Sequence, residues 1–107
     1  MAKGEAPVLE AMADINAVSL ERTELDPQSL ILVRLAALAA VDAPPSSYLM
    51  HIGPAAKVGI TADRVMDVLI AVAPIVGTPK TMAAATKIVE ALGMAIDLAE
   101  ADQGYDN

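Results

Sequence analysis

The sequence predicts an all-α protein with about five helices. Apolar residues recur three or four positions apart, as on one face of a helix, and no alternating segment is long enough to indicate a strand. Proline, glycine and small polar residues interrupt this pattern where helices commonly begin and end. At 107 residues the chain is long enough for one domain. We therefore predict a single helical domain over residues 1–107, with a core from about 7 to 101 and flexible tails at 1–6 and 102–107.

The first two predicted helices span about residues 7–21 and 27–41. The second begins at "ELDPQS", where Asp26 is a suitable N-cap because its side chain can accept a hydrogen bond from a first-turn N–H group. Pro27 suits the first helical position because its ring already holds φ near the helical value. This helix is apolar on every side except at Arg34, which is the pattern of a buried element.

Three more helices follow, separated by short turns. The segment "DAPPSS" closes the second helix and opens the third, which ends before Gly59, a residue suited to the left-handed conformation at a helix end. Thr61 is a suitable cap for a fourth helix over about 62–75. Thr78 is a suitable cap for the last and longest helix, which we expect to continue to about Ala101.

The composition predicts that the domain associates with copies of itself. Hydrophobic residues make up 55% of the chain, 22 residues are alanine, and phenylalanine and tryptophan are absent. Each alanine buries little area, so one small domain has a weak core, and its leftover apolar surface usually marks an interface. The last helix carries two apolar stripes, one for its own core and one for a neighbour; a single wide core face is the alternative. The stripes are Met82, Ala85, Val89, Leu92, Ile96 and Ala99, and Ala84, Ile88, Ala91, Ala95 and Leu98. We predict antiparallel helical hairpins packed in a symmetric homo-oligomer.

Charge and composition exclude several classes of function. A net charge of −7 argues against nucleic acid as a partner, because phosphates require a basic surface. No apolar run is long enough to cross a membrane and no secretory signal is visible, so we expect a cytoplasmic protein. The absence of cysteine excludes disulfides, thiolate metal sites and cysteine-based reactions. With a single histidine as well, the sequence predicts no metal site and no cofactor.

Two segments carry a resemblance to a known family. They are "LDPQSLILVRLAALAA" and "SSYLMHIGPAAKVGITADRVMDVLIAVAPIVGTPKTMAAA", with His51, the following small pair Ala55 and Ala56, "GIT" before an acid, and "GTP". In this order they resemble the carboxymuconolactone decarboxylase family, which includes the alkylhydroperoxidase D proteins, over about residues 20–95. The resemblance implies an all-helical fold and assembly as a trimer or hexamer.

The peroxidase branch of that family carries Cys-x-x-Cys-x-x-x-His and an upstream glutamate. Counted back from His51, the cysteine positions hold Pro44 and Ser47, and the glutamate position falls on Leu32, or on Ile31 if the turn differs by one residue. Neither proline nor leucine ionises, and a serine alkoxide is inaccessible near neutral pH. A thiol peroxidase activity is therefore excluded by the chemistry of these side chains.

The decarboxylase branch needs neither cysteine nor cofactor, and its chemistry implies a cation for the substrate carboxylate and a general acid. His51, Tyr48 and Ser47 share one helical face and are the catalytic candidates. Pro54 cannot donate to the Met50 carbonyl, so a kink there is expected to shape a polar recess around the histidine. The alternatives are structural: a core histidine, a packed tyrosine and a first-turn serine.

Arg34 and Lys57 are the candidates for holding the carboxylate. The alternative for Arg34 is a structural ion pair or an interface contact, because an unpaired buried charge is costly. Its possible partners are Glu21, Glu24, Asp67 and Asp97. Two functions follow. The first is a cofactor-free decarboxylase acting on a small carboxylic or lactone acid; the second is a non-catalytic ligand-binding or interaction protein on the same fold.

Overall fold

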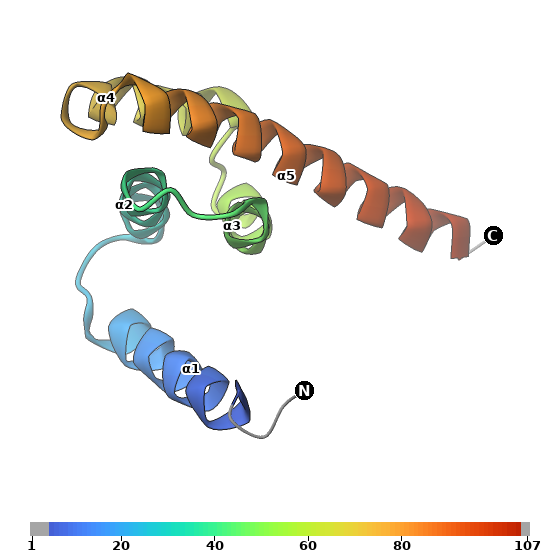
Figure 1. Ribbon diagram of the computed structural model, residues 1–107. Helices are drawn as coiled ribbons and strands as arrows, with labels where there is room; N and C mark the ends of the chain where they lie inside the picture. The colour runs from blue at the N-terminus through green and yellow to red at the C-terminus, as the bar shows by residue number, and fades with distance from the viewer. Residues whose placement is uncertain (1–4, 106–107) are drawn as a thin grey trace.

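The computed structural model describes residues 5–105, and the side chains of residues 5–101; this part of the chain forms five helices and no strand (Figure 1). The helices are α1 (Glu5–Arg22), α2 (Pro27–Ala40), α3 (Pro45–Lys57), α4 (Ala62–Val76) and α5 (Thr78–Tyr105). The all-α prediction is confirmed. The ends differ from expectation, because α1 already begins at Glu5 and α5 continues beyond Ala101. The remaining parts of the predicted tails, 1–4 and 106–107, lie outside the described residues.

Side-chain hydrogen bonds cap the starts of α2 and α4, and a glycine follows the end of α3. The Asp26 carboxylate accepts a hydrogen bond from the Ser29 N–H group at 3.0 Å, and Thr61 Oγ1 accepts one from the Arg64 N–H group at 3.2 Å, as predicted for the two caps. Gly59 has a φ of 82°, the left-handed conformation expected after α3.

The start of α5 differs from the prediction. Thr78 is the first residue of the helix and not a cap outside it. Gly77, with a φ of 95°, makes the turn, and its carbonyl accepts hydrogen bonds from the Thr81 N–H group and from Thr81 Oγ1, at 3.1 and 2.7 Å. Glycine is suited to this position because it has no Cβ to clash at positive φ.

The helices α2 to α5 form two hairpins in two layers. In Figure 1, α2 and α3 are seen end-on and lie side by side, while α5 crosses above them with α4 behind it. The core lies between the layers and consists of Ile31, Leu35, Ala39, Ala43, Tyr48, Ala55, Ile60, Leu69, Ala84, Ile88 and Ala91. Only one stripe of α2 is buried, and Val33 on its outer side is 54% exposed. The prediction of a helix buried on all sides therefore does not hold within one chain.

An ion pair connects the turn between α2 and α3 to α5. Lys87 Nζ lies 2.6 Å from Asp42 Oδ1, and this contact lowers the pKa of the Asp42 carboxyl through a hydrogen bond and the nearby positive charge. Asp42 has a φ of 54°, which aspartate tolerates better than most residues because its short side chain bonds locally. The ion pair thus connects the turn between α2 and α3 to the first half of α5.

Helix α1 stands apart from the other four. None of its residues is buried, and its backbone lies too far from α2–α5 to pack directly against them (Figure 1). Its apolar side chains are about half exposed, with Ile15 at 61%. None of the five helices combines the length and the hydropathy that a membrane span requires. The wide separation between α1 and the hairpin α2–α3 leaves room for a pocket.

Candidate functional site

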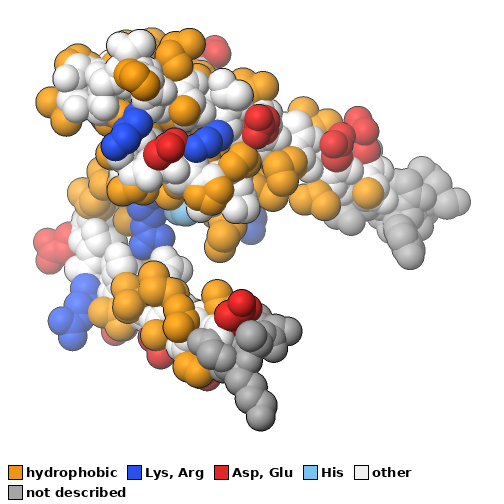
Figure 2. Space-filling model, viewed as in Figure 1, with side chains coloured by type: hydrophobic (Ala, Val, Ile, Leu, Met, Phe, Trp, Pro, Cys, Tyr) orange, Lys and Arg blue, Asp and Glu red, His pale blue; other side chains and the backbone are white. Residues whose placement is uncertain are grey.

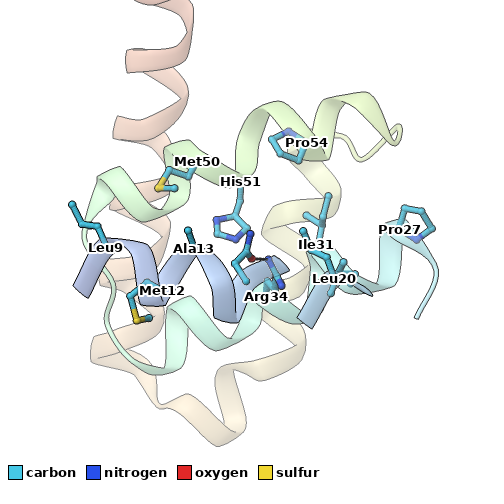
Figure 3. A pocket seen from close by; sticks show the side chains of 12 residues that line it. Leu9, Met12, Ala13, Leu20, Pro27, Ile31, Arg34, Met50, His51 and Pro54 are labelled. Atoms are coloured by element: carbon cyan, nitrogen blue, oxygen red, sulfur yellow. Dashed lines mark hydrogen bonds between the residues drawn. The ribbon is translucent and has the colours of Figure 1, made fainter. Parts of the chain in front are cut away.

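A pocket of about 570 Å³ separates α1 from the hairpin α2–α3 (Figure 3). Its lining comes from α1, from the first half of α2, and from the middle of α3. These residues are Leu9, Met12, Ala13, Asn16, Leu20, Pro27, Leu30, Ile31, Arg34, Met50, His51 and Pro54. Most of them are apolar, so Asn16, Arg34 and His51 supply the polar groups that are available to orient a molecule in the pocket.

His51 enters the pocket from α3, and its tautomer is set by a backbone contact. Nδ1 lies 2.8 Å from the carbonyl oxygen of Ser47, one turn earlier in the helix. A carbonyl oxygen only accepts hydrogen bonds, so Nδ1 must carry the proton in this contact. In the neutral ring Nε2 is then an acceptor, and in the imidazolium it is a donor. The ring is therefore held in place while one nitrogen remains available for proton transfer.

Pro54, one turn after His51, also lines the pocket. Helix α3 does not end there but continues to Lys57. Proline has no N–H group, so the Met50 carbonyl has no donor at its usual position four residues later. The recess beside the histidine is thus lined mostly by apolar residues, where the sequence predicted a polar recess.

Arg34 lies on the adjacent wall of the pocket, and Figure 3 shows its side chain near that of His51. Its two terminal nitrogens donate to Asn16 Oδ1 at 2.7 Å and to Ser19 Oγ at 3.1 Å, both on α1. The acidic partners considered from the sequence do not bind it: among the described residues no carboxylate lies within ion-pair distance of Arg34. The guanidinium thus holds α1 through neutral groups, and its positive charge has no counter-ion within the part of the chain that the structure describes.

The other three candidates lie outside the pocket lining. Tyr48 is in the core and 1% exposed, and burial, with a smaller contribution from the Asp42 carboxylate, raises the pKa of its phenol. Ser47 contacts the histidine through its backbone carbonyl and not its hydroxyl. Lys57 is exposed in the last turn of α3. The structure brings His51 and Arg34 together at the pocket and leaves Tyr48, Ser47 and Lys57 away from it.

Asn16 was not identified from the sequence. Its side-chain amide lies on a face of α1 that is otherwise largely apolar, and a polar residue on such a face is the pattern by which the sequence indicates it. Periodicity indicates which residues share a face but not which helix lies opposite. Among residues 5–101, no group of three histidine, aspartate or glutamate side chains is close enough to hold a metal ion.

Comparison with curated proteins and with solved structures finds no match for this chain. A model of the carboxymuconolactone decarboxylase family matches residues 6–91, which include α2, α3, α4, nearly all of α1 and the first half of α5. The match therefore covers every residue that lines the pocket. With five helices in the described chain and no cysteine in the sequence, the protein belongs to the carboxymuconolactone decarboxylase family and lacks the cysteine pair of its peroxidase branch.

Proposed function

We propose that the protein is a cofactor-free lyase that decarboxylates a small carboxylic or lactone acid in the pocket between α1 and α2–α3. One observation carries the proposal. His51 Nε2, which the Nδ1 contact with Ser47 leaves available, lines the same pocket as the Arg34 guanidinium, which has no counter-ion among residues 5–101. The pocket volume, about 570 Å³, is within the range of small-molecule sites, and its apolar lining suits the non-polar part of such an acid.

The proposed reaction divides the work between the two residues. Arg34 binds the substrate carboxylate through an N–H group not used for α1 or in exchange for its bond to Ser19. The carbon–carbon bond to the carboxylate then breaks, its electron pair moves into the adjoining carbonyl system, and CO2 leaves. Protonated His51 gives its Nε2 proton to the resulting carbanion. The Ser47 carbonyl keeps Nδ1–H in place before and after this transfer.

A second candidate function is binding without turnover. It is favoured by the position of Tyr48, which lies in the core, so that His51 is the one proton-transfer group among the residues lining the pocket. A pocket with one cation, one amide and an apolar lining is sufficient to bind an apolar carboxylate, and the family fold alone does not require catalysis.

The test uses a panel of lactone acids and β-keto acids, with CO2 release and calorimetric binding measured for each. We expect His51→Gln to abolish turnover and keep binding, and Arg34→Gln to weaken binding by about tenfold or more, the loss typical of a charged hydrogen bond. Arg64→Gln is the matched control, because Arg64 is an exposed arginine outside the pocket. Binding without turnover by the unmodified protein supports the second candidate, and equal behaviour of the Arg34 and Arg64 variants contradicts both.

A further inference from the structure

The Asn16 side chain lies on the α1 wall of the pocket and contacts Arg34 through its amide oxygen. Arg34 Nη1 donates to Asn16 Oδ1 at 2.7 Å, and Figure 3 marks this bond with a dashed line at Arg34. A guanidinium has hydrogen-bond donors and no acceptor, so the amide can present only its oxygen to Arg34. The NH2 group of Asn16 is therefore the end of the amide that the arginine leaves unused.

This NH2 group is surrounded by apolar side chains. Within residues 5–101, Asn16 Nδ2 donates no hydrogen bond to another group of the chain. The pocket residues Ala13 and Leu20, on the same helix, have side chains without any hydrogen-bonding group. Figure 2 shows hydrophobic side chains over α1 beside the hollow that separates this helix from the others. The amide hydrogens are thus available to a molecule in the pocket.

The contact with Arg34 also makes the NH2 group a better donor. A positive charge at the amide oxygen draws electrons away from the nitrogen, so hydrogen bonds through the two ends of the amide strengthen each other. Because Nδ2 and Oδ1 are bonded to the same carbon, the NH2 group lies only one amide group away from the guanidinium. The pocket therefore offers a charged donor and a neutral donor side by side.

We propose that Asn16 determines the substrate class by donating from Nδ2 to a carbonyl oxygen β to the carboxylate that Arg34 binds. A β-keto acid or a β-carbonyl ester has its two acceptor groups one carbon apart, and they match the two neighbouring donors. A saturated acid has only the carboxylate and leaves the NH2 group in the apolar lining without a partner, which is unfavourable. The pocket thus selects acids that have this second carbonyl.

The assignment rests on the proposed function and completes its reaction. When the bond to the carboxylate breaks, its electron pair forms a carbon–carbon double bond and CO2 leaves. The π pair of the β-carbonyl moves onto its oxygen, which becomes an enolate oxygen facing the Asn16 NH2 group. A donor placed where negative charge develops lowers the barrier. His51 Nε2 then protonates the carbon, and the carbonyl forms again.

Calorimetric binding of two acids of equal chain length separates this donor from the carboxylate site. Monobutyl malonate has an ester carbonyl β to the carboxylate and resists loss of CO2, whereas octanoate has no carbonyl at that position. In Asn16→Ala we expect the ratio of the octanoate Kd to the malonate Kd to fall about tenfold, because a buried carbonyl loses its hydrogen bond. Ser19→Ala is the matched control: it also removes one bond between Arg34 and α1, but Ser19 does not line the pocket. Its ratio should equal that of the unmodified protein.

Asn16→Asp separates the donor from the anchoring of α1. The aspartate keeps an acceptor for Arg34 but has no NH2 group, so the ratio should fall as it does in Asn16→Ala. Circular dichroism checks that the helices are intact in all three variants. For an acid that the unmodified protein decarboxylates, Asn16→Ala should also lower kcat on the order of a hundredfold, the loss typical of one such donor.

Equal ratios in Asn16→Ala, Ser19→Ala and the unmodified protein overturn the assignment and show that Asn16 only anchors α1. Release of CO2 with an unchanged ratio in Asn16→Ala rejects the role of Asn16 and leaves the proposed lyase standing. The expected fall in the ratio without release of CO2 from any acid rejects the lyase and retains Asn16 as the residue that selects the ligand.

Discussion

Replacing Tyr48 with phenylalanine should stabilise the protein. The Tyr48 hydroxyl is fully buried and has no hydrogen-bond partner among the described residues. Folding therefore removes the water bound to this hydroxyl and supplies nothing in return, which costs about 1–3 kcal/mol. Tyr48→Phe keeps the ring in the core and deletes one atom, whose lost dispersion contacts cost only about 0.5 kcal/mol. We expect a net gain of about 1 kcal/mol in the free energy of unfolding.

Urea unfolding at one fixed protein concentration measures this gain. An increase of about 1 kcal/mol moves the midpoint up by roughly 0.5–1 M urea and the melting temperature by about 4–8 °C. Tyr48→Ala serves as the control for the ring, and its cavity should cost about 3–5 kcal/mol. A phenylalanine variant less stable than the unmodified protein would show that the hydroxyl has a partner in the folded state, and the reasoning from its burial would be wrong.

The remaining predictions concern pH and helix α1. The pKa of the Tyr48 phenol is raised above 10.0 in the folded protein, so the stability that comes from keeping this phenol protonated is complete below about pH 10 and is lost as pH rises through the folded-state pKa. The decrease of the urea midpoint at alkaline pH should therefore be smaller in Tyr48→Phe than in the unmodified protein. The pKa of the Asp42 carboxyl is lowered below 3.8 in the folded protein, so the stability that comes from its ionised form is present above about pH 4 and is lost as pH falls through the folded-state pKa. An NMR titration of Lys87→Gln should give a higher Asp42 pKa than in the unmodified protein. Arg34→Gln should accelerate amide hydrogen exchange in α1 and leave exchange in α5 unchanged, because Arg34 donates hydrogen bonds to Asn16 and Ser19 on α1. Equal exchange in the variant and the unmodified protein would mean that other contacts hold α1.

The residues at which the helices begin and end are largely predictable from the sequence, because they depend on local chemistry. Asp26, Thr61 and Gly59 act within a few residues of their own positions, and all three were assigned correctly. The start of α5 was one residue in error because the turn is made by Gly77 and not by Thr78. Both residues are suited to a helix start, and the sequence alone does not rank them.

The composition of the site was only partly predictable, because it depends on which helices lie opposite each other. His51 and Tyr48 are three residues apart and share a broad helical face, but the boundary between core and pocket passes between them. The charge of Arg34 predicted a polar partner, and acids were the natural choice. The observed partners, Asn16 and Ser19, come from α1, whose position follows from no local pattern.

The separation of α1 from the core has an evolutionary consequence. Among residues 5–101, every buried residue belongs to the segment from Ile31 to Ala91, so the hydrophobic core and the pocket wall formed by α1 are made of different residues. Substitutions at Leu9 or Met12 reshape the pocket without opening a cavity in the core. Selection can therefore adjust which molecule fits the pocket while the fold is left unchanged, and a change of ligand preference need not pass through unstable intermediates.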